Sequence, residues 1–302
     1  MPFNDIYRKQ VSLLVRVLPA VAEQDCFALK GGTAINLFVR DMPRLSVDID
    51  LTYVPVQSRQ ASLKAINAGM QAIAKAIEAA IPGTQITSSK VEGAITTLHV
   101  RARNAQIKIE VTPVLRGCVH EPRTLRVSPA VEESFGFAET QVVSFADLYG
   151  GKIVAALDRQ HPRDFFDVRD LLANEGIDDV LRNAFVVYLL SHNRPMAEVL
   201  AAKRKPLDQE FVRGFQGMTA GEVTIEELVA ARETLVETMV RGMPKEHRTF
   251  LIGFERGKPN WPSLGLTHVS ELPAIKWRQR NLDTLPEKDR SKLVAKLEEV
   301  LA

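Results

Sequence analysis

Three short stretches in the first 110 residues carry side chains that could perform phosphoryl chemistry. A Gly-Gly-Thr turn occupies residues 31–33, an acidic pair is formed by Asp48 and Asp50, and Glu110 lies further along the chain. A glycine turn at the start of a helix lets backbone N–H groups approach a phosphate, and the helix dipole favours the anion there. Carboxylates bind divalent magnesium, which prefers carboxylate and phosphate oxygens together with water. The combination predicts a site for a metal-bound polyphosphate.

Asp48 and Asp50 are predicted to point to the same side of one strand, because apolar residues alternate with them over 47–51. Glu110 alternates with apolar neighbours in the same way within 106–115, so it is the candidate third carboxylate. The three would hold two magnesium ions, one activating an attacking hydroxyl and both stabilising in-line phosphoryl displacement.

Each of these elements also has a purely structural interpretation. A Gly-Gly pair is commonly a plain turn, and an Asp-x-Asp strand is commonly a solvated face. The combination is more specific, because like charges on one strand face repel each other unless a cation lies between them.

The elements that would position these residues fall into two groups with a boundary near residue 140, which predicts domains at 1–140 and 141–302. In the first, strands alternate with helices, which indicates an α/β class. Its expected elements are a helix capped by Asn4 or Asp5, strands over 27–29 and 47–52, helices over 33–39 and 58–80, and strands over 84–89, 94–102 and 106–115. The second is predicted to be helical over 145–159, 163–174, 178–191, 195–203, 224–240 and 244–256, with an ordered loop over 257–284 before a final charged helix.

Composition narrows the class of protein without choosing a function. The 302 residues are 45% hydrophobic and 25% charged, which is typical of a folded chain, and the formal net charge is only +2. Cys26 and Cys118 show no metal-binding or disulfide spacing. The sequence has no apolar run long enough to cross a membrane and no signal-peptide pattern at its start, so a cytoplasmic protein without a membrane partner is expected.

Two motifs carry a resemblance to a known family. Lys30-Gly31-Gly32-Thr33 and the strand with Asp48 and Asp50 are similar to the AbiEii/AbiGii toxin nucleotidyltransferases of the DNA polymerase β-like superfamily. The resemblance implies a polymerase β-like nucleotidyltransferase domain with a mixed sheet, followed by a mainly helical domain that completes the active-site cleft. It also implies that the residues of 30–33 contact the triphosphate and that Glu110 is the third metal ligand. Gly32 stands where many superfamily members have serine, so either the Thr33 hydroxyl or backbone N–H groups alone would bind phosphate.

The resemblance continues through 147–167, which is similar to the family's second signature, and through 254–261 near the end of the chain. It implies that Lys152 contacts the nucleotide triphosphate and that Asp167 lies in or near the active site. Lys152 and Arg159 are seven residues apart, on one face of a helix, so the pair could bind triphosphate. The alternative is a helix stabilised by ion pairs between arginines 159 and 163 and the nearby aspartates.

Other residues have weaker claims to a role. His161 could act as an acid or base, although a loop role is favoured, and Tyr149 and Phe166 could stack on a base but are expected in the core. Basic residues gather in two runs that could contact an RNA backbone or could simply be solvated. The runs are Arg101, Arg103, Lys108, Arg116, Arg123 and Arg126, and Arg194, Lys203, Arg204 and Lys205.

The expected activity is a magnesium-dependent transfer of a nucleoside monophosphate from a nucleoside triphosphate to a hydroxyl, with release of pyrophosphate. The resemblance implies that the acceptor is the 3′ end of a tRNA, that translation is blocked, and that the setting is a bacterial toxin–antitoxin or phage-defence system with a cognate antitoxin protein. One alternative is a kinase-like toxin that phosphorylates a protein. The other is a catalytically idle nucleotide-binding protein.

Overall fold

The first part of the chain folds around one mixed β-sheet. In the computed structural model, which describes residues 3–302, the strands are hydrogen-bonded in the order β3-β4-β5-β2-β1-β7-β6. β2 pairs in parallel with β5, and β1 in parallel with β7, whereas the other neighbours are antiparallel. The strands are β1 (Phe27–Lys30), β2 (Asp48–Tyr53), β3 (Gln85–Val91), β4 (Ala94–Ala102), β5 (Ala105–Arg116), β6 (Arg123–Arg126) and β7 (Glu139–Val142).

Helices in this part begin at residues suited to capping. The side chain of Asn4 accepts a hydrogen bond from the N–H of Ile6 (2.9 Å), and that of Ser58 accepts one from Ala61 (3.3 Å). The glycine turn opens a short helix that continues as a π-helix, and its Ile35 and Phe38 are buried. The elements are α1 (Asp5–Ala22), α2 (Gly31–Ala34), the π-helix η1 (Ile35–Val39), α3 (Arg59–Ala80) and α4 (Pro129–Phe135).

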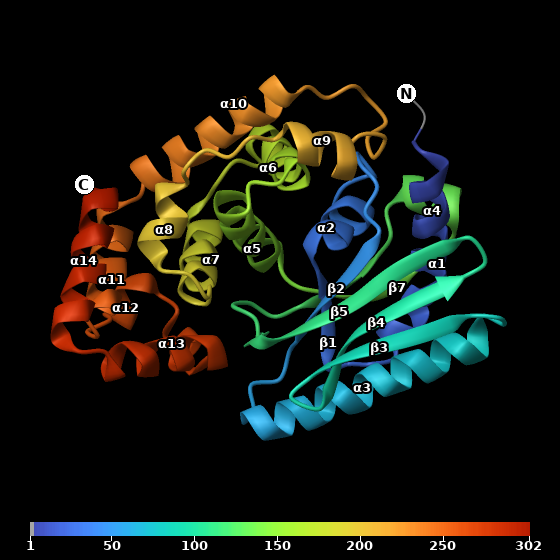
Figure 1. The fold of residues 1–302 in the computed structure, drawn as a ribbon, viewed down its shortest axis with the longest axis horizontal. Helices are drawn as coiled ribbons and strands as arrows, with labels where there is room; N and C mark the ends of the chain where they lie inside the picture. Colours follow the sequence, from blue (N-terminus) through green and yellow to red (C-terminus); the bar gives the residue numbers. More distant parts are fainter. Residues whose placement is uncertain (1–2) are drawn as a thin grey trace. The chain divides into compact units, whose positions relative to one another are not determined.

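The two faces of the sheet differ in chemistry. α1 and α3 pack against each other and against β4 and β5, and Figure 1 shows α3 running along β3 and β4. Phe27 points to this side, because a Cβ added to Gly69 of α3 would lie 2.7 Å from its ring. Residues in phase with Phe27, such as Leu29 and Ile109, are buried there. Strand alternation therefore sends the intervening polar side chains to the opposite face.

The second part of the chain is helical. Asp178 and Thr224 cap their helices by accepting hydrogen bonds from Leu181 (2.8 Å) and Glu227 (3.2 Å). Its helices are α5 (Phe145–Asp158), α6 (Pro162–Asn174), α7 (Asp179–Leu190), α8 (Met196–Ala201), α9 (Asp208–Gly214), α10 (Ile225–Val236) with the π-helix η2 (Glu237–Arg241), α11 (Lys245–Glu255), α12 (Trp261–Leu264), the 3-10 helix η3 (Thr267–Glu271), α13 (Pro273–Thr284) and α14 (Glu287–Leu301).

α5 is the central helix of the second part, packed against α6, α7 and α8. Gly150 and Gly151 let it approach α7 closely. A Cβ at Gly150 would lie 3.0 Å from the backbone N of Phe185, and one at Gly151 would lie 3.3 Å from the ring of Tyr188. This packing fixes the helix that carries Lys152.

The prediction of a loop over 257–284 is wrong, because α12, η3 and α13 occupy most of it. Pro262 and Pro273 lie in the first turns of α12 and α13, where the missing proline N–H has no helical partner to lose. The prolines therefore start helices here. The short elements β6, α4, β7 and α9 are also absent from the sequence prediction.

The chain divides into two compact units after Ser144, close to the predicted boundary at residue 140. Gln216–Glu222 belongs with the first unit, where the backbone N–H of Leu45 donates to the carbonyl of Met218 (2.7 Å). A mixed sheet followed by helices confirms the α/β class and the mainly helical second part. No helix in the described residues 3–302 is long and apolar enough to span a membrane.

Candidate active site

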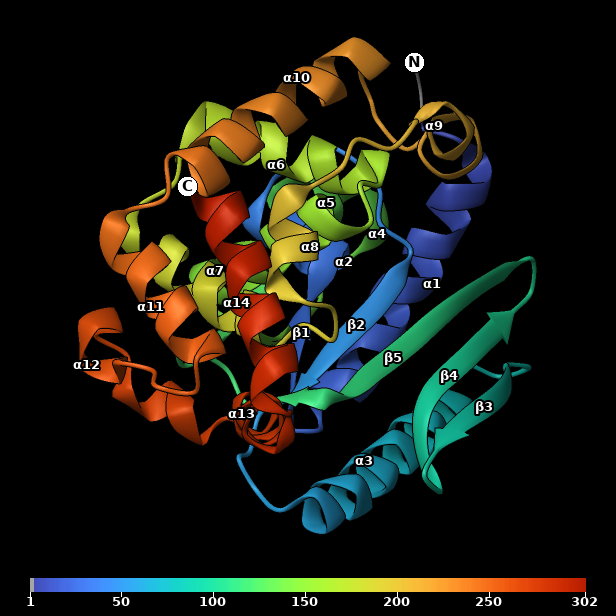
Figure 2. The ribbon, with the colours of Figure 1, turned by 60° about the vertical axis from the view of Figure 1, so that its left-hand side comes forward.

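The predicted carboxylates lie on two neighbouring strands of the first unit. Asp50 of β2 is paired directly with Glu110 of β5, and Asp48 is paired with Lys108. Figure 2 shows β5 between β2 and β4. Because directly paired residues share a face of a sheet, Asp48, Asp50 and Glu110 project from the face opposite α3. The structure thus places the three predicted carboxylates on one face of the sheet.

The glycine turn lies directly against this acidic face. Gly31 has φ +74°, and a Cβ added to it would be 2.6 Å from Oδ2 of Asp50. A Cβ at Gly32 would be 2.7 Å from the Arg44 guanidinium and 2.9 Å from the Ser46 hydroxyl. A side chain at either position would have to displace these groups, and at Gly31 the positive φ favours glycine as well.

Thr33 joins the turn to the acidic strand. Its side chain is fully buried, and Oγ1 donates a hydrogen bond to the backbone carbonyl of Asp48 (2.5 Å). Asn36 stabilises the turn from the other side, since its Nδ2 donates to the carbonyl of Gly32 (2.9 Å). The Thr33 hydroxyl therefore positions Asp48. A phosphate contact of this hydroxyl stays a prediction.

Two lysines lie among the carboxylates. Lys30 of β1 is paired with Asp50 across the strands, and burial lowers the pKa of its ammonium, an effect that Asp50 and Glu110 partly offset. Nζ of Lys108 lies 2.6 Å from Oε2 of Glu110. Burial alone would lower the pKa of Lys108, but the hydrogen bond to Glu110 and the charges of Glu110, Asp48 and Asp50 outweigh it and raise the pKa. Lys108 was considered in the sequence only as part of a basic run, although its strand phase matches that of Asp48.

The residues present fit a magnesium ion in their chemistry. Asp48, Asp50 and Glu110 offer the hard oxygen ligands that magnesium prefers, and the Lys108 ammonium already stands among them as a cation. Among residues 3–302, no three acidic, His or Cys side chains are gathered tightly enough to enclose an ion. Binding of an ion would therefore require the carboxylates to converge, and Lys108 would compete with the ion for Glu110.

The second unit contains a buried cluster of charges around Lys152. Its Nζ lies 2.9 Å from both Oδ1 of Asp164 and Oδ2 of Asp167, and Arg159 contacts Asp164 through Nε (2.5 Å) and a terminal nitrogen (2.8 Å). The aspartate side chains are fully buried, whereas Arg159 is 62% exposed. Lys152 lies on α5, but α5 ends at Asp158, so Arg159 lies in the turn that follows and does not share a helix face with Lys152. The ion pair between Arg159 and Asp164, which the alternative interpretation expected, is present.

Asp164 is the residue on which this cluster converges, and it was not among the predicted site residues. Burial would raise the pKa of its carboxyl, but Lys152 and Arg159 outweigh burial and hold the pKa well below its usual range. The carboxylate therefore stays ionised. The spacing of five residues between Arg159 and Asp164 indicated a possible ion pair. The contact of both Lys152 and Arg159 with Asp164 is visible only in the fold.

The remaining candidates have structural roles in their own unit. His161 caps α6, since its Nδ1 accepts a hydrogen bond from the N–H of Arg163 (3.1 Å). Burial, followed by the charge of Arg163, lowers its pKa to about 4. Tyr149 and Phe166 are buried, as expected of core aromatics. The first basic run is not continuous on the surface, because Arg116 is buried and donates to the Ser62 hydroxyl (2.8 Å).

Comparisons with known proteins identify the family of the chain and a similar fold. The chain matches the model of the family described as nucleotidyl transferase AbiEii toxin, type IV toxin–antitoxin system, over residues 12–281. Its fold is similar to that of MenT4, a nucleotidyltransferase toxin from Mycobacterium tuberculosis H37Rv, with 14% identity, a TM-score of 0.57, and coverage of 98% of this chain and 94% of that chain. No match was found among curated proteins. Because the family model covers most of the sequence, the chain belongs to the AbiEii nucleotidyltransferase toxins of type IV toxin–antitoxin systems.

Proposed function

We propose that this toxin transfers a nucleoside monophosphate from a nucleoside triphosphate to the 3′ hydroxyl of a tRNA. The acceptor oxygen forms a bond to the α-phosphorus, the bond from that phosphorus to the β-phosphate oxygen breaks, and pyrophosphate leaves. A tRNA with a blocked 3′ end cannot be aminoacylated, so translation stops. A cognate antitoxin protein, a cytoplasmic location and a role in phage defence belong to the same proposal.

The in-register pair of Asp50 and Glu110, with Asp48 beside it and the glycine turn against it, carries this proposal. These three carboxylates would hold magnesium. Bound magnesium supplies activation of the acceptor hydroxyl and stabilisation of charge on the transferring phosphorus. The glycine turn begins a helix, so its backbone N–H groups would bind phosphate oxygens beside the carboxylates.

The triphosphate would also be bound by cations of the chain. Lys30 lies in register with Asp50, so its ammonium is suited to neutralise phosphate charge next to the carboxylates. In the second unit, Arg159 is mostly exposed although it contacts Asp164, and its guanidinium can form paired hydrogen bonds with a phosphate. Lys152 would also bind the triphosphate. Asp167, which forms an ion pair with Lys152, would lie in the active site beside it.

The test is to incubate the purified protein with magnesium, bacterial tRNA and each nucleoside triphosphate labelled at either the α- or the γ-phosphate. Nucleotidyl transfer puts the α-label, and not the γ-label, on the tRNA 3′ end. An Asp50→Asn variant serves as the inactive control. A γ-label on protein would instead establish a kinase, and an absence of label in any product would support the idle binding protein. Either result overturns the proposal.

A further inference from the structure

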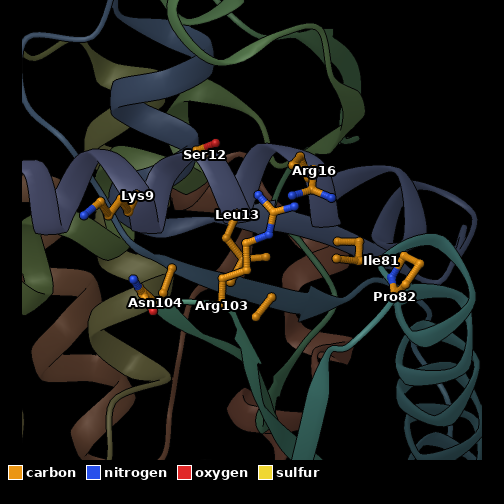
Figure 3. Close-up of a pocket in the computed structure, with 10 residues that line it drawn as sticks. Lys9, Ser12, Leu13, Arg16, Ile81, Pro82, Arg103 and Asn104 are labelled. Carbon is orange, nitrogen blue, oxygen red and sulfur yellow. The ribbon is translucent and has the colours of Figure 1, made fainter.

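A hollow of about 450 Å³ lies in the first unit, on the side of the sheet covered by α1. One wall is a face of α1, where Lys9, Ser12, Leu13 and Arg16 follow each other at helical spacing. The opposite wall is the tip of the hairpin between β4 and β5 at residues 102–105, with the end of α3 alongside. Figure 3 shows the side chain of Arg103 rising from the hairpin toward α1 and Arg16.

Three cations surround this hollow without an acidic partner. Lys9, Arg16 and Arg103 are exposed, and none of them is in an ion pair with any carboxylate of the described residues 3–302. No Asp or Glu lines the hollow. Like charges that face one concave surface repel each other, and an anion placed between them removes that cost. The charge pattern thus selects a negatively charged ligand.

The floor of the hollow is apolar. Leu13, Ile81 and Ala102 are at most 8% exposed and lie between the cations. A free phosphate would gain nothing from this floor, whereas a nucleotide within a chain has the apolar face of its base to place there. The volume is also in the range of pockets that enclose a small organic group.

The hollow is separate from the carboxylates. Ala105, at the hairpin, precedes Glu110 by five residues, a path of about 16 Å along β5, and the Glu110 side chain lies on the opposite face of the sheet. A ligand in the hollow therefore does not touch the reacting atoms. It can only add binding energy for a substrate long enough to reach both places.

We propose that this hollow binds a phosphodiester segment of the RNA acceptor, with one nucleotide on the apolar floor and its phosphates at Lys9, Arg16 and Arg103. The assignment rests on the proposed function, because it takes the acceptor to be RNA. Each lost cation–phosphate contact removes about one unit from the slope of binding against salt.

The experiment compares Arg16→Gln/Arg103→Gln with the unaltered protein, using fluorescence anisotropy of a 5′-labelled tRNA transcript at several potassium chloride concentrations. We expect about tenfold weaker binding and a salt slope smaller by about two. The matched control is Lys64→Gln/Lys90→Gln, which removes the same charge from exposed positions of α3 and β3, outside the hollow and both basic runs, and leaves binding within about twofold. Steady-state transfer assays should show a higher KM for tRNA and an unchanged kcat, with unchanged KM for the triphosphate.

Several outcomes overturn the inference. The first is equal tRNA binding by Arg16→Gln/Arg103→Gln and the unaltered protein. The second is an equal loss of tRNA binding in both double variants, because the loss of charge alone would then explain the weaker binding. An absence of tRNA binding by the unaltered protein also contradicts it. If Arg16→Gln/Arg103→Gln weakens tRNA binding but the unaltered protein transfers no nucleotide, the proposed reaction is refuted and the assignment of the hollow stands. The failure of the proposed function and the failure of this inference are therefore distinguishable.

Discussion

Asp50 and Glu110 are direct partners across the parallel strands β2 and β5, although 59 residues separate them in the sequence. Both carboxylates face away from the helices that cover the sheet, and Lys108 contacts Glu110 from the next position on the same face. The acidic face therefore carries its own internal counter-ion before any metal arrives.

Asp50→Asn is expected to reduce nucleotidyl transfer by about 100-fold or more, because a metal ligand contributes several kcal/mol to transition-state stabilisation. The measurement is label transfer under saturating triphosphate. Glu133→Gln, which removes an exposed carboxylate from α4, should leave the rate unchanged. Near-normal transfer by Asp50→Asn would remove this carboxylate from the site.

Lys108→Met is expected to tighten the binding of divalent manganese, used as a spectroscopic substitute for magnesium, because the variant removes the cation that contacts Glu110. Manganese affinity is measured by electron paramagnetic resonance in the absence of nucleotide. The control is Lys90→Met on β3, an exposed lysine of the same sheet. Weaker manganese binding in Lys108→Met would mean that the lysine supports the ion instead of competing with it.

Gly31→Ala should lower both stability and nucleotide transfer, whereas Gly93→Ala should lower stability alone. Both glycines have positive φ, but a Cβ at Gly31 meets Asp50, while a Cβ at Gly93 has nothing within 4 Å. Backbone strain is expected to cost each variant about 1 kcal/mol in the free energy of unfolding. The clash should add to that cost and lower transfer only in Gly31→Ala. Equal activity of the two variants would contradict the close fit of the turn to Asp50.

Lys152→Met is expected to lower the free energy of unfolding by about 3–5 kcal/mol, because it leaves Asp164 and Asp167 buried without their shared ammonium. Urea denaturation measures the change. Lys276→Met breaks an exposed pair with Glu271 and should cost less than about 1 kcal/mol. A small cost for Lys152→Met would show that the buried cluster can be rearranged easily.

His161 predicts a dependence of stability on pH. Its pKa falls from 6.5 to about 4 on folding, so the unfolded chain binds more protons between these values. The free energy of unfolding should therefore decrease as the pH is lowered from about 6.5 toward 4, by about 1–3 kcal/mol from this residue. His161→Asn keeps a capping side chain without the titrating ring. If the free energy of unfolding of the variant depends on pH in the same way as that of the unaltered protein, the pKa of His161 is not lowered by folding.

The sequence predicted the acidic face because strand alternation at Asp48, Asp50 and Glu110 is a local signal. It could not predict which strands are neighbours, so the contact between Lys108 and Glu110 and the place of Lys30 beside Asp50 required the sheet order. Asp164 was missed for a similar reason, since burial and convergence of cations depend on helix packing. The helices after residue 257 were missed because prolines were interpreted as loop signals.

The pairing of β5 with β2 also limits which insertions and deletions β5 can accept before Glu110. Side chains on a strand alternate, so a deletion of one residue between the hairpin tip and Glu110 would send Glu110 to the helix-covered face and bring Ile109 to the acidic one. Removal of two residues would preserve the orientation. Related toxins should therefore differ in this stretch by even numbers of residues, and odd changes should appear only with a compensating bulge.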